Sequence, residues 1–229
     1  MILSLPKAEL LDYIRAQTRT FFPDRYDFAG GDVDIAFQTA LDRLEHCMCV
    51  ITHPGFHDAQ GNTTFSHLHA DQYAQLLYFL GNSLWHQSQN RPLCDKLLLL
   101  NRTLFSLFLS YKCAMPEHFL LGHPIGTILG NAVYGDYLVV FQGVTVNTAA
   151  DEDGAPAPRL GKGLFLGAHA KIIGSLPVGD RVSVGVNATV YQQAIPDDSV
   201  VSAEGPNGNT VRPRRKAQCK AQDYFSVQI

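Results

Sequence analysis

The sequence lacks the features that mark nucleic-acid-binding, membrane-spanning or exported proteins. Its formal net charge is −3 and it has no long basic run, so it lacks the electrostatic patch that binds nucleic acid. No uninterrupted apolar run of about 18 residues is present, because Asn101 and Arg102 break the longest candidate, and a membrane span is not expected. The first residues also lack the charged and apolar regions of a signal peptide.

Cysteine is scarce and irregularly placed. The 5 cysteines are an odd number without regular spacing, which favours reduced thiols in the cytoplasm over a disulfide framework. Cys47 and Cys49 are too close together for a zinc knuckle, and no metal is expected. With 229 residues, 46% of them hydrophobic, the chain can bury a sizeable core in one or two domains.

A six-residue repeat dominates the second half of the chain. In each hexapeptide the first residue is a branched aliphatic, the second is usually Gly, and the fifth is Leu, Ala or Val. The first positions are Leu160, Leu166, Ile172, Val178 and Val184. This period is typical of a parallel β-helix, in which short strands point the first residue inward and glycine permits the turn. Because each coil buries its inner face only against its neighbours, the repeats are expected to stack into a solenoid.

The same repeat runs upstream in a different frame. Its first positions are Ile128, Tyr134, Val140 and Val146. The two frames do not match across residues 147–159, so this polar stretch with Gly and Pro is predicted to be an excursion loop. Long insertions in compact domains are usually functional or disordered, and we favour a function for this one.

Residues 1–112 predict helices. Apolar residues recur at helical spacing in four segments, at about 6–22, 32–50, 67–87 and 93–110. The predicted fold class is therefore α+β, with an all-helical N-terminal domain (1–112), a parallel β-helix domain (113–204) and a C-terminal tail (205–229). The short basic cluster at residues 212–216 is interpreted as part of a solvated tail.

His123 is the first candidate for chemistry, because it lies where the chain enters the repeats. An imidazole can accept a proton near neutral pH, which suits a general base that deprotonates an alcohol. A histidine without further context is more often a surface or packing residue. Its role therefore depends on the motifs around it.

Those motifs resemble the serine O-acetyltransferases among the hexapeptide-repeat acyltransferases. That family has a His-x-x-Gly before the first coils, a Gln-x-Val-Thr strand and a Gly-Ala-x-Ala-Lys turn. Here they correspond to His123 with Gly126, to residues 142–145 and to residues 167–171, and the similarity covers about residues 119–204. The resemblance implies a left-handed β-helix, acetyl-CoA as co-substrate, and a homotrimer or a dimer of trimers with acetyl-CoA in the groove between subunits.

The resemblance also implies roles for individual residues. His123 would take the proton from the acceptor hydroxyl as that hydroxyl attacks the thioester. The positions Gly143, Ala168, Lys171 and Val186 would contact the coenzyme, since small turn residues allow backbone amides to approach a ligand. The alternative is that they are only corners of the solenoid.

The chain departs from the family at several points. In the family an Asp some way before the base orients it, whereas here the segment before His123 is shorter and offers Glu117 as its only carboxylate, either as the partner or as an exposed turn residue. Gly122 stands where the family has an Asp. At the end of the excursion loop the family has Arg-His, which serve the amino acid, whereas this chain has Pro-Ala at 156–157 and Arg159 three residues displaced.

These departures leave the acceptor open. We predict an acetyl-CoA-dependent O-acetyltransferase of the serine acetyltransferase-like type, with free L-serine as at best a poor acceptor. The alternatives are a sugar or specialised-metabolite hydroxyl as acceptor, and a catalytically silent trimeric scaffold. Arg159 and Asp71 are candidates for acceptor binding, although Asp71 also fits a role in capping a helix.

Overall fold

The computed structural model describes residues 1–146, 149–150, 155–203 and 208–229. Four helices form the N-terminal part: α1 (Lys7–Phe21), α2 (Gly31–Met48), α3 (Ala70–Ser88) and α4 (Arg91–Phe105). All four predicted helices are present, but α4 ends five residues before its predicted end. It ends there because Ser106 takes a left-handed conformation (φ 51°) while its N–H still bonds to the carbonyl of Arg102. Within the described residues no helix is long and apolar enough to cross a membrane.

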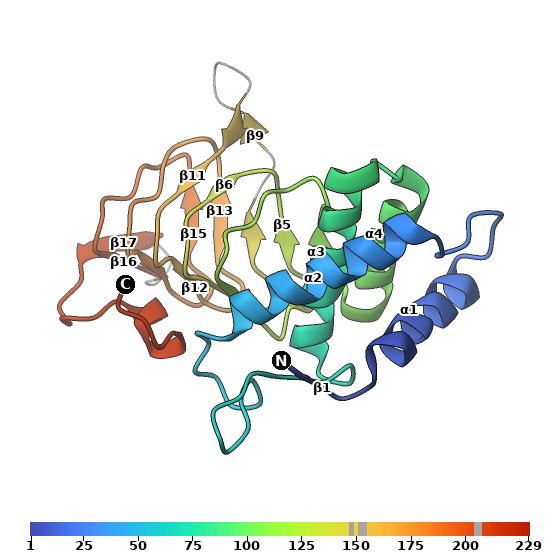
Figure 1. Ribbon diagram of the computed structural model, residues 1–229. Coiled ribbons are helices and arrows are strands. Elements are labelled where there is room, and N and C mark those ends of the chain that lie inside the picture. Colours follow the sequence, from blue (N-terminus) through green and yellow to red (C-terminus); the bar gives the residue numbers. More distant parts are fainter. Residues whose placement is uncertain (147–148, 151–154, 204–207) are drawn as a thin grey trace.

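Helix α3 lies at the centre of the helical part and contacts the strands of the second part of the chain (Figure 1). Its residues are buried almost continuously from Asp71 to Leu84. The polar side chains in this stretch bond to the chain that enters the solenoid: Gln75 Nε2 donates to the carbonyl of Phe119 (2.9 Å), and Asn82 Nδ2 donates to that of Tyr111 (2.8 Å). These two hydrogen bonds fix α3 against the start of the β-helix.

The second part of the chain is a parallel β-helix whose short strands form three sheets (Figure 1). The first sheet contains β3 (Phe108–Leu109), β5 (Ile128–Leu129), β8 (Thr145–Val146), β13 (Lys171–Ile173) and β15 (Thr189–Tyr191). The second contains β4 (Phe119–Gly122), β7 (Leu138–Phe141), β12 (Phe165–Leu166), β14 (Ser183–Val184), β16 (Ser199–Ala203) and β17 (Asn209–Pro213). The third contains β6 (Val133–Tyr134) and β11 (Arg159–Leu160). Outside the coils, β1 (Ile2–Leu3) pairs with β2 (Thr64–Phe65).

The strand register follows the sequence repeat. Leu166 pairs with Val184, and Ile172 pairs with Val190, so each coil takes up three hexapeptides. The five first-position residues from Leu160 to Val184 are all 4% exposed or less, which confirms that they fill the interior. Burying such aliphatic side chains stabilises the fold by roughly 1.5–3 kcal/mol each.

One predicted interior position is wrong. Ile128 is 44% exposed, because it pairs with Thr145 while its neighbour Leu129 pairs with the inward-facing Val146. The upstream frame is therefore shifted by one residue in the first coil. Leu176, at a fifth position of the later frame, is 43% exposed, because the chain leaves strand β13 before it reaches that residue.

The excursion and the C-terminal segment complete the fold. In the excursion, β9 (Ala149–Ala150) pairs antiparallel with β10 (Pro156–Ala157), and residues 147–148 and 151–154 lie outside the described residues. The C-terminal segment returns along the second sheet, where β17 pairs antiparallel with β16. The short helix η1 (Lys220–Tyr224) then stacks Tyr224 on Phe165 at 5.9 Å. Residues 212–216 thus belong to the folded body, which corrects their interpretation as a solvated tail.

Candidate active site

His123 lies in the turn after β4, beside the first turn of α3. Its N–H donates to Oδ1 of Asp71 (3.0 Å), and its ring Nδ1 lies 3.9 Å from Oδ2 of the same carboxylate. The Asp71 side chain is only 4% exposed, whereas that of His123 is 68% exposed. The partial positive charge at the N-terminus of α3 stabilises a carboxylate at this position. An accessible imidazole therefore stands against a buried carboxylate.

The backbone of His123 has the left-handed conformation, with φ of 49°. Such values often mark functional sites because they are strained for residues other than glycine. In this fold, however, Tyr137, His169, Arg181 and Asn187 share the same conformation at other turns of the solenoid. The positive φ is therefore a property of these turns, and the Asp71 contact is what distinguishes His123.

Glu117 lies against a different histidine. Its Oε2 is 3.5 Å from Nε2 of His46, and its side chain is 77% exposed. Among the described residues, the only carboxylate within ion-pair distance of His123 belongs to Asp71, which is 52 residues upstream. Asp71 was predicted to bind the acceptor or to cap a helix, because no local motif connects it with His123.

Gly122, where the family has an Asp, is explained by its neighbour Phe141. A Cβ atom at Gly122 would lie 2.9 Å from Cε1 of Phe141, a separation that side chains do not tolerate. Phe141 in turn packs against Phe165 and Tyr224, each with ring centroids 5.7 Å away. An aromatic cluster, formed by Phe141, Phe165 and Tyr224, therefore occupies the side of β4 next to His123.

The predicted coenzyme positions Ala168 and Val186 lie in register with Gln142 on successive coils, and the third predicted position, Gly143, directly follows Gln142. The residue after Ala168 donates its N–H to the carbonyl of the residue before Gly143 (2.8 Å). The residue after Val186 donates to the carbonyl of Ala168 (3.0 Å). The three positions therefore form one corner of the solenoid, which we call the coenzyme corner. Val186 is 59% exposed there.

Two neighbours constrain the coenzyme corner. Gly143 has φ of 68°, and a Cβ atom there would overlap the ring of His169, so the position requires glycine. Lys171 Nζ donates to the carbonyl of His169 (3.2 Å), which places this cation next to the corner. Within the described part of the chain, Gln142 Oε1 is buried without a hydrogen-bond partner. The sequence analysis noted Gln142 only as part of a motif.

Arg159 lies on the third sheet. It is exposed and belongs to β11, where it pairs with Val133 of β6. Strand β4, which leads into His123, belongs to the second sheet. The described contacts include none between Arg159 and His123 or Asp71. The structure therefore does not bring Arg159 to the His123–Asp71 pair within one chain.

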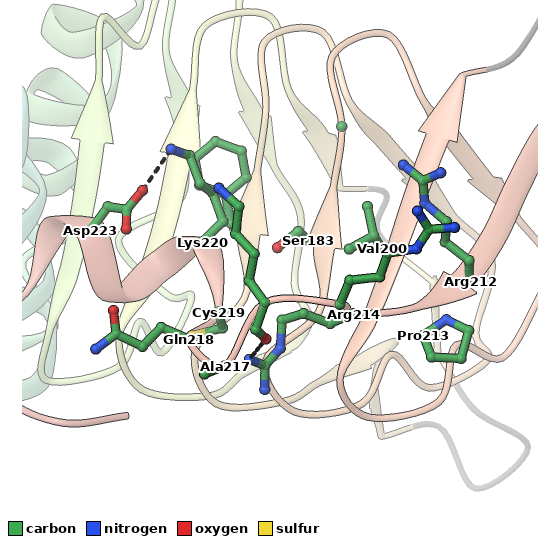
Figure 2. A pocket seen from close by; sticks show the side chains of 14 residues that line it. Ser183, Val200, Arg212, Pro213, Arg214, Ala217, Gln218, Cys219, Lys220 and Asp223 are labelled. Carbon is green, nitrogen blue, oxygen red and sulfur yellow. Dashed lines mark hydrogen bonds and ion pairs between the residues drawn. The ribbon is translucent and has the colours of Figure 1, made fainter.

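A pocket of about 730 Å³ lies between the second sheet and the returning C-terminal segment (Figure 2). Phe165, Ser183, Gly185 and Val200 line it from the coils, and residues 212–220 and Asp223 line it from the segment. Five basic residues of the segment are among the lining: Arg212, Arg214, Arg215, Lys216 and Lys220. The lining residue Gly185 directly precedes Val186 of the coenzyme corner. Sequence reasoning missed it, because no repeat predicts where the segment folds back.

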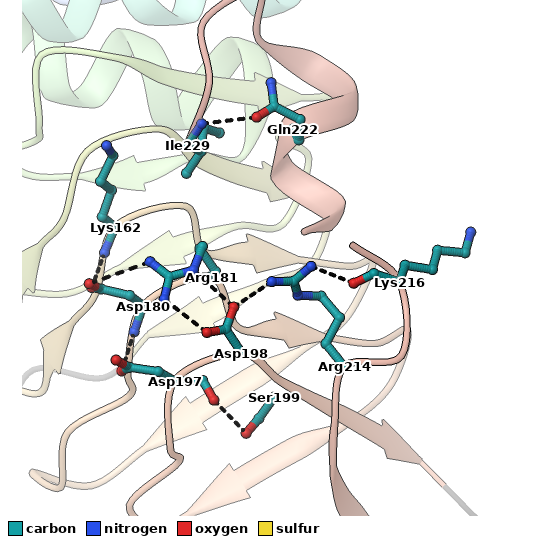
Figure 3. Close-up of polar contacts among 10 residues, drawn as sticks. All are labelled: Lys162, Asp180, Arg181, Asp197, Asp198, Ser199, Arg214, Lys216, Gln222 and Ile229. Atoms are coloured by element: carbon teal, nitrogen blue, oxygen red, sulfur yellow. Dashed lines mark hydrogen bonds and ion pairs between the residues drawn. The ribbon is translucent and has the colours of Figure 1, made fainter. Parts of the chain in front are cut away.

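Ion pairs hold the segment in place (Figure 3). Arg181 donates to both carboxylate oxygens of Asp198 at 2.9 Å, and Arg214 donates to Oδ1 of Asp198 at 2.5 Å. The hydrogen bonds from Arg181, and then those from Arg214, hold the pKa of Asp198 well below its ordinary value. Arg212, Arg215 and Lys216 take part in none of the ion pairs among the described residues. They remain available to an anion.

Three of the buried cysteines are poor nucleophiles. Burial raises the pKa of Cys47 and Cys94 to about 12 and that of Cys113 to about 11. A thiol with such a pKa holds little thiolate at neutral pH, and the thiolate is the reactive form. All five cysteines are free thiols.

Comparisons with known proteins point to one family, although no protein-family model matches the chain. A serine acetyltransferase of Synechococcus elongatus is 28% identical over 123 residues, which is 53% of this chain and 50% of that protein. A serine acetyltransferase of Synechocystis is 35% identical over 98 residues, 41% of this chain and 39% of that protein. The chain thus spans about half the length of the curated relatives it matches, or less.

Solved structures give the same fold. The serine acetyltransferase of Vibrio cholerae aligns with a TM-score of 0.66 at 20% identity, covering 92% of this chain and 81% of that one. A serine acetyltransferase solved in complex with cysteine aligns with a TM-score of 0.63 at 16% identity, covering 95% and 98%. The expected fold, a helical N-terminal part followed by a left-handed β-helix, is confirmed. The chain is therefore similar to serine acetyltransferases in sequence, over about half of its length or less, and in fold.

Proposed function

We propose that this protein is an acetyl-CoA-dependent O-acetyltransferase of the serine acetyltransferase-like type, with His123 as general base. One observation carries the proposal: the buried carboxylate of Asp71 accepts the backbone N–H of an accessible histidine and lies 3.9 Å from its ring Nδ1, at the entrance to the β-helix. The alignment of Gly143, Ala168 and Val186 along the coenzyme corner supports it. Asp71 is a positioning residue here, and Glu117 has no part in the reaction.

The geometry gives each nitrogen of His123 a role. Nδ1 faces Asp71, which leaves Nε2 for the acceptor hydroxyl. As the hydroxyl oxygen attacks the thioester carbonyl carbon, its proton moves to Nε2. The carbon–sulfur bond then breaks, and the same proton passes from Nε2 to the departing sulfur. The Asp71 carboxylate stabilises the imidazolium that exists between these two transfers.

Binding of acetyl-CoA would use the coenzyme corner and the basic pocket together. The pantetheine arm would run along Gly143, Ala168 and Val186, where side chains are small or exposed. The phosphates would meet Lys171 and the basic residues of the pocket, since arginine and lysine side chains bind phosphate oxygens. The adjacency of Val186 and pocket residue Gly185 in the chain supports this arrangement.

We further propose a homotrimer, or a dimer of trimers, located in the cytoplasm. Ile125 is 65% exposed and lies beside the coenzyme corner, since its carbonyl accepts the N–H of Gly143 (2.9 Å). Together with Val186 it forms an apolar edge that a neighbouring subunit would cover. The free thiols support a reducing compartment.

The names of the relatives make L-serine the first acceptor to test. We expect turnover with L-serine but a KM above about 1 mM, the upper end for dedicated enzymes, because Pro156 and Ala157 stand where the family has its carboxylate clamp. The experiment measures CoA release with L-serine and with a panel of sugars and hydroxylated metabolites. Faster turnover of a sugar would establish the alternative acceptor. CoA binding without release, with every acceptor tested, would refute the enzyme and support a scaffold.

A further inference from the structure

A second cluster of histidine and carboxylate side chains lies where the helical part meets the first coil. His46 is near the end of α2, while Glu117 and His118 directly precede β4. Each offers one ligand atom, and these atoms lie within 4.8 Å of one another. The rings of His46 and His118 are 4.8 Å apart between centroids. The reaction at His123 uses none of these residues.

The backbone holds the two histidines together. Cys47 Sγ donates to the carbonyl of Phe119 (3.3 Å) and accepts the N–H of the same residue (3.4 Å). Cys47 directly follows His46, and Phe119 directly follows His118. These two hydrogen bonds therefore fix the end of α2 beside the start of β4, so the proximity of His46 and His118 results from buried contacts.

His118 is oriented as a metal-bound histidine would be. Its Nδ1 lies 2.9 Å from Oδ2 of Asp136, and its N–H donates to Oδ1 of the same carboxylate (2.7 Å). Tyr137 stacks on the ring at 5.0 Å with an interplanar angle of 8°. A carboxylate on one imidazole nitrogen fixes the tautomer and leaves the other nitrogen, Nε2, as the ligand. The ring is thus held in place before any ion binds.

We propose that His46, Glu117 and His118 bind a Zn²⁺ ion, with Asp136 orienting His118. Two imidazole nitrogens and one carboxylate are a set that Zn²⁺ accepts, with water completing the tetrahedron. Ligand atoms in such a site lie about 3.4 Å apart, given bond lengths of roughly 2.0–2.1 Å. His46 and Glu117 can close the remaining distance by rotation, because their side chains are 58% and 77% exposed. This site differs from the sequence expectation of no metal.

The ion would join the end of α2 to the segment that enters the solenoid. The ligands come from two parts of the fold, and the unfolded chain does not hold them together. The ion therefore binds the folded state, and its binding energy stabilises that state. At a Zn²⁺ concentration about 100 times Kd, we expect the Tm to rise by roughly 5–10 °C. The ion would leave the geometry of the His123–Asp71 pair unchanged.

The test uses the full chain after dialysis against a chelator. Calorimetric titration with Zn²⁺ is expected to show one ion per chain, and His46→Ala and Glu117→Gln should each weaken binding by at least about 10-fold. Both residues are exposed, so these variants should fold. His86→Ala removes an exposed histidine of α3 and is the matched control. It should bind as the parent chain does.

Three outcomes would overturn the proposal. The first is the absence of Zn²⁺ binding in the parent chain. The second is unchanged affinity in both His46→Ala and Glu117→Gln. The nearby exposed thiol of Cys49 is the competing ligand, so Cys49→Ser is titrated in parallel, and the Co²⁺ complex is examined for thiolate charge-transfer absorption. Loss of binding in Cys49→Ser with retention in His46→Ala would place the ion on the thiol and refute the site.

Discussion

Replacing Asp71 with Asn tests the proposed base directly. Asn keeps an oxygen that can accept the N–H of His123 but removes the negative charge 3.9 Å from Nδ1. At that separation and an effective dielectric constant of about 20, the charge interacts with an imidazolium by about 4 kcal/mol. Because the His123 side chain is 68% exposed, we halve this value for solvent screening. About 2 kcal/mol corresponds to a fall in kcat of about 30-fold.

The assay measures CoA release at saturating acetyl-CoA and separates kcat from KM. We expect Asp71→Asn to lower kcat with little change in the KM for acetyl-CoA, since the contacts of Asp71 are with His123 and not with Gly143, Ala168 or Val186. The double variant Asp71→Asn/His123→Ala should be no slower than His123→Ala alone, because both residues act as one unit. Activity within threefold of the parent in folded Asp71→Asn, or additive losses in the double variant, would refute the reasoning.

Two further predictions follow from the site and the solenoid. His123→Ala should lower turnover by about 100-fold or more, as loss of a positioned proton acceptor does. Glu117→Gln should leave turnover within about twofold of the parent, because Glu117 faces His46. A larger loss in Glu117→Gln would contradict the assignment. Light scattering should show a trimer or a hexamer, and Val186→Glu should lower that mass by placing a charge on the apolar edge; a monomer of the parent chain at micromolar concentration would refute the assembly.

The interior positions of the solenoid could be predicted from the sequence because the six-residue repeat is a local pattern. A residue that recurs every six positions faces inward whatever surrounds it, and Leu160, Ile172 and Val184 are buried as expected. The rule fails where the local spacing changes. The interior positions Leu129 and Tyr134 are only five residues apart. Counting six residues back from Tyr134 therefore selects Ile128 instead of Leu129.

The partner of His123 could not be predicted from spacing. Asp71 reaches it across 52 residues because buried contacts, such as that of Gln75 with Phe119, dock α3 on the entering strand. The same limit applies to His46 and His118, which the Cys47 contact brings together. Motifs selected His123 and the positions of the coenzyme corner as candidates, but contacts between the two parts of the fold determine which side chains surround them.

The C-terminal segment provides the last prediction, because the pocket exists only while the segment stays docked. Asp198 bonds to Arg181 and Arg214, and the Arg214 side chain is only 14% exposed. Asp198→Asn would leave the Arg214 charge largely buried without its partner, and we expect a loss of roughly 1 kcal/mol at neutral pH, since the Asp198 side chain is 42% exposed. Asp223→Asn, which breaks the exposed pair with Lys220, is the matched control and should change stability less.

The difference in stability between Asp198→Asn and the parent chain should depend on pH in a defined direction. The pKa of Asp198 is lowered in the folded state by the hydrogen bonds from Arg181 and Arg214. The carboxylate of Asp198 therefore makes its full contribution to stability above the unfolded pKa of about 3.9, and this contribution is lost as pH falls below that value. Melting curves should show Asp198→Asn less stable than the parent at pH 7, with the gap narrowing as pH falls below about 4. A gap that is constant with pH would mean that packing, and not the charge of Asp198, holds the segment over the pocket.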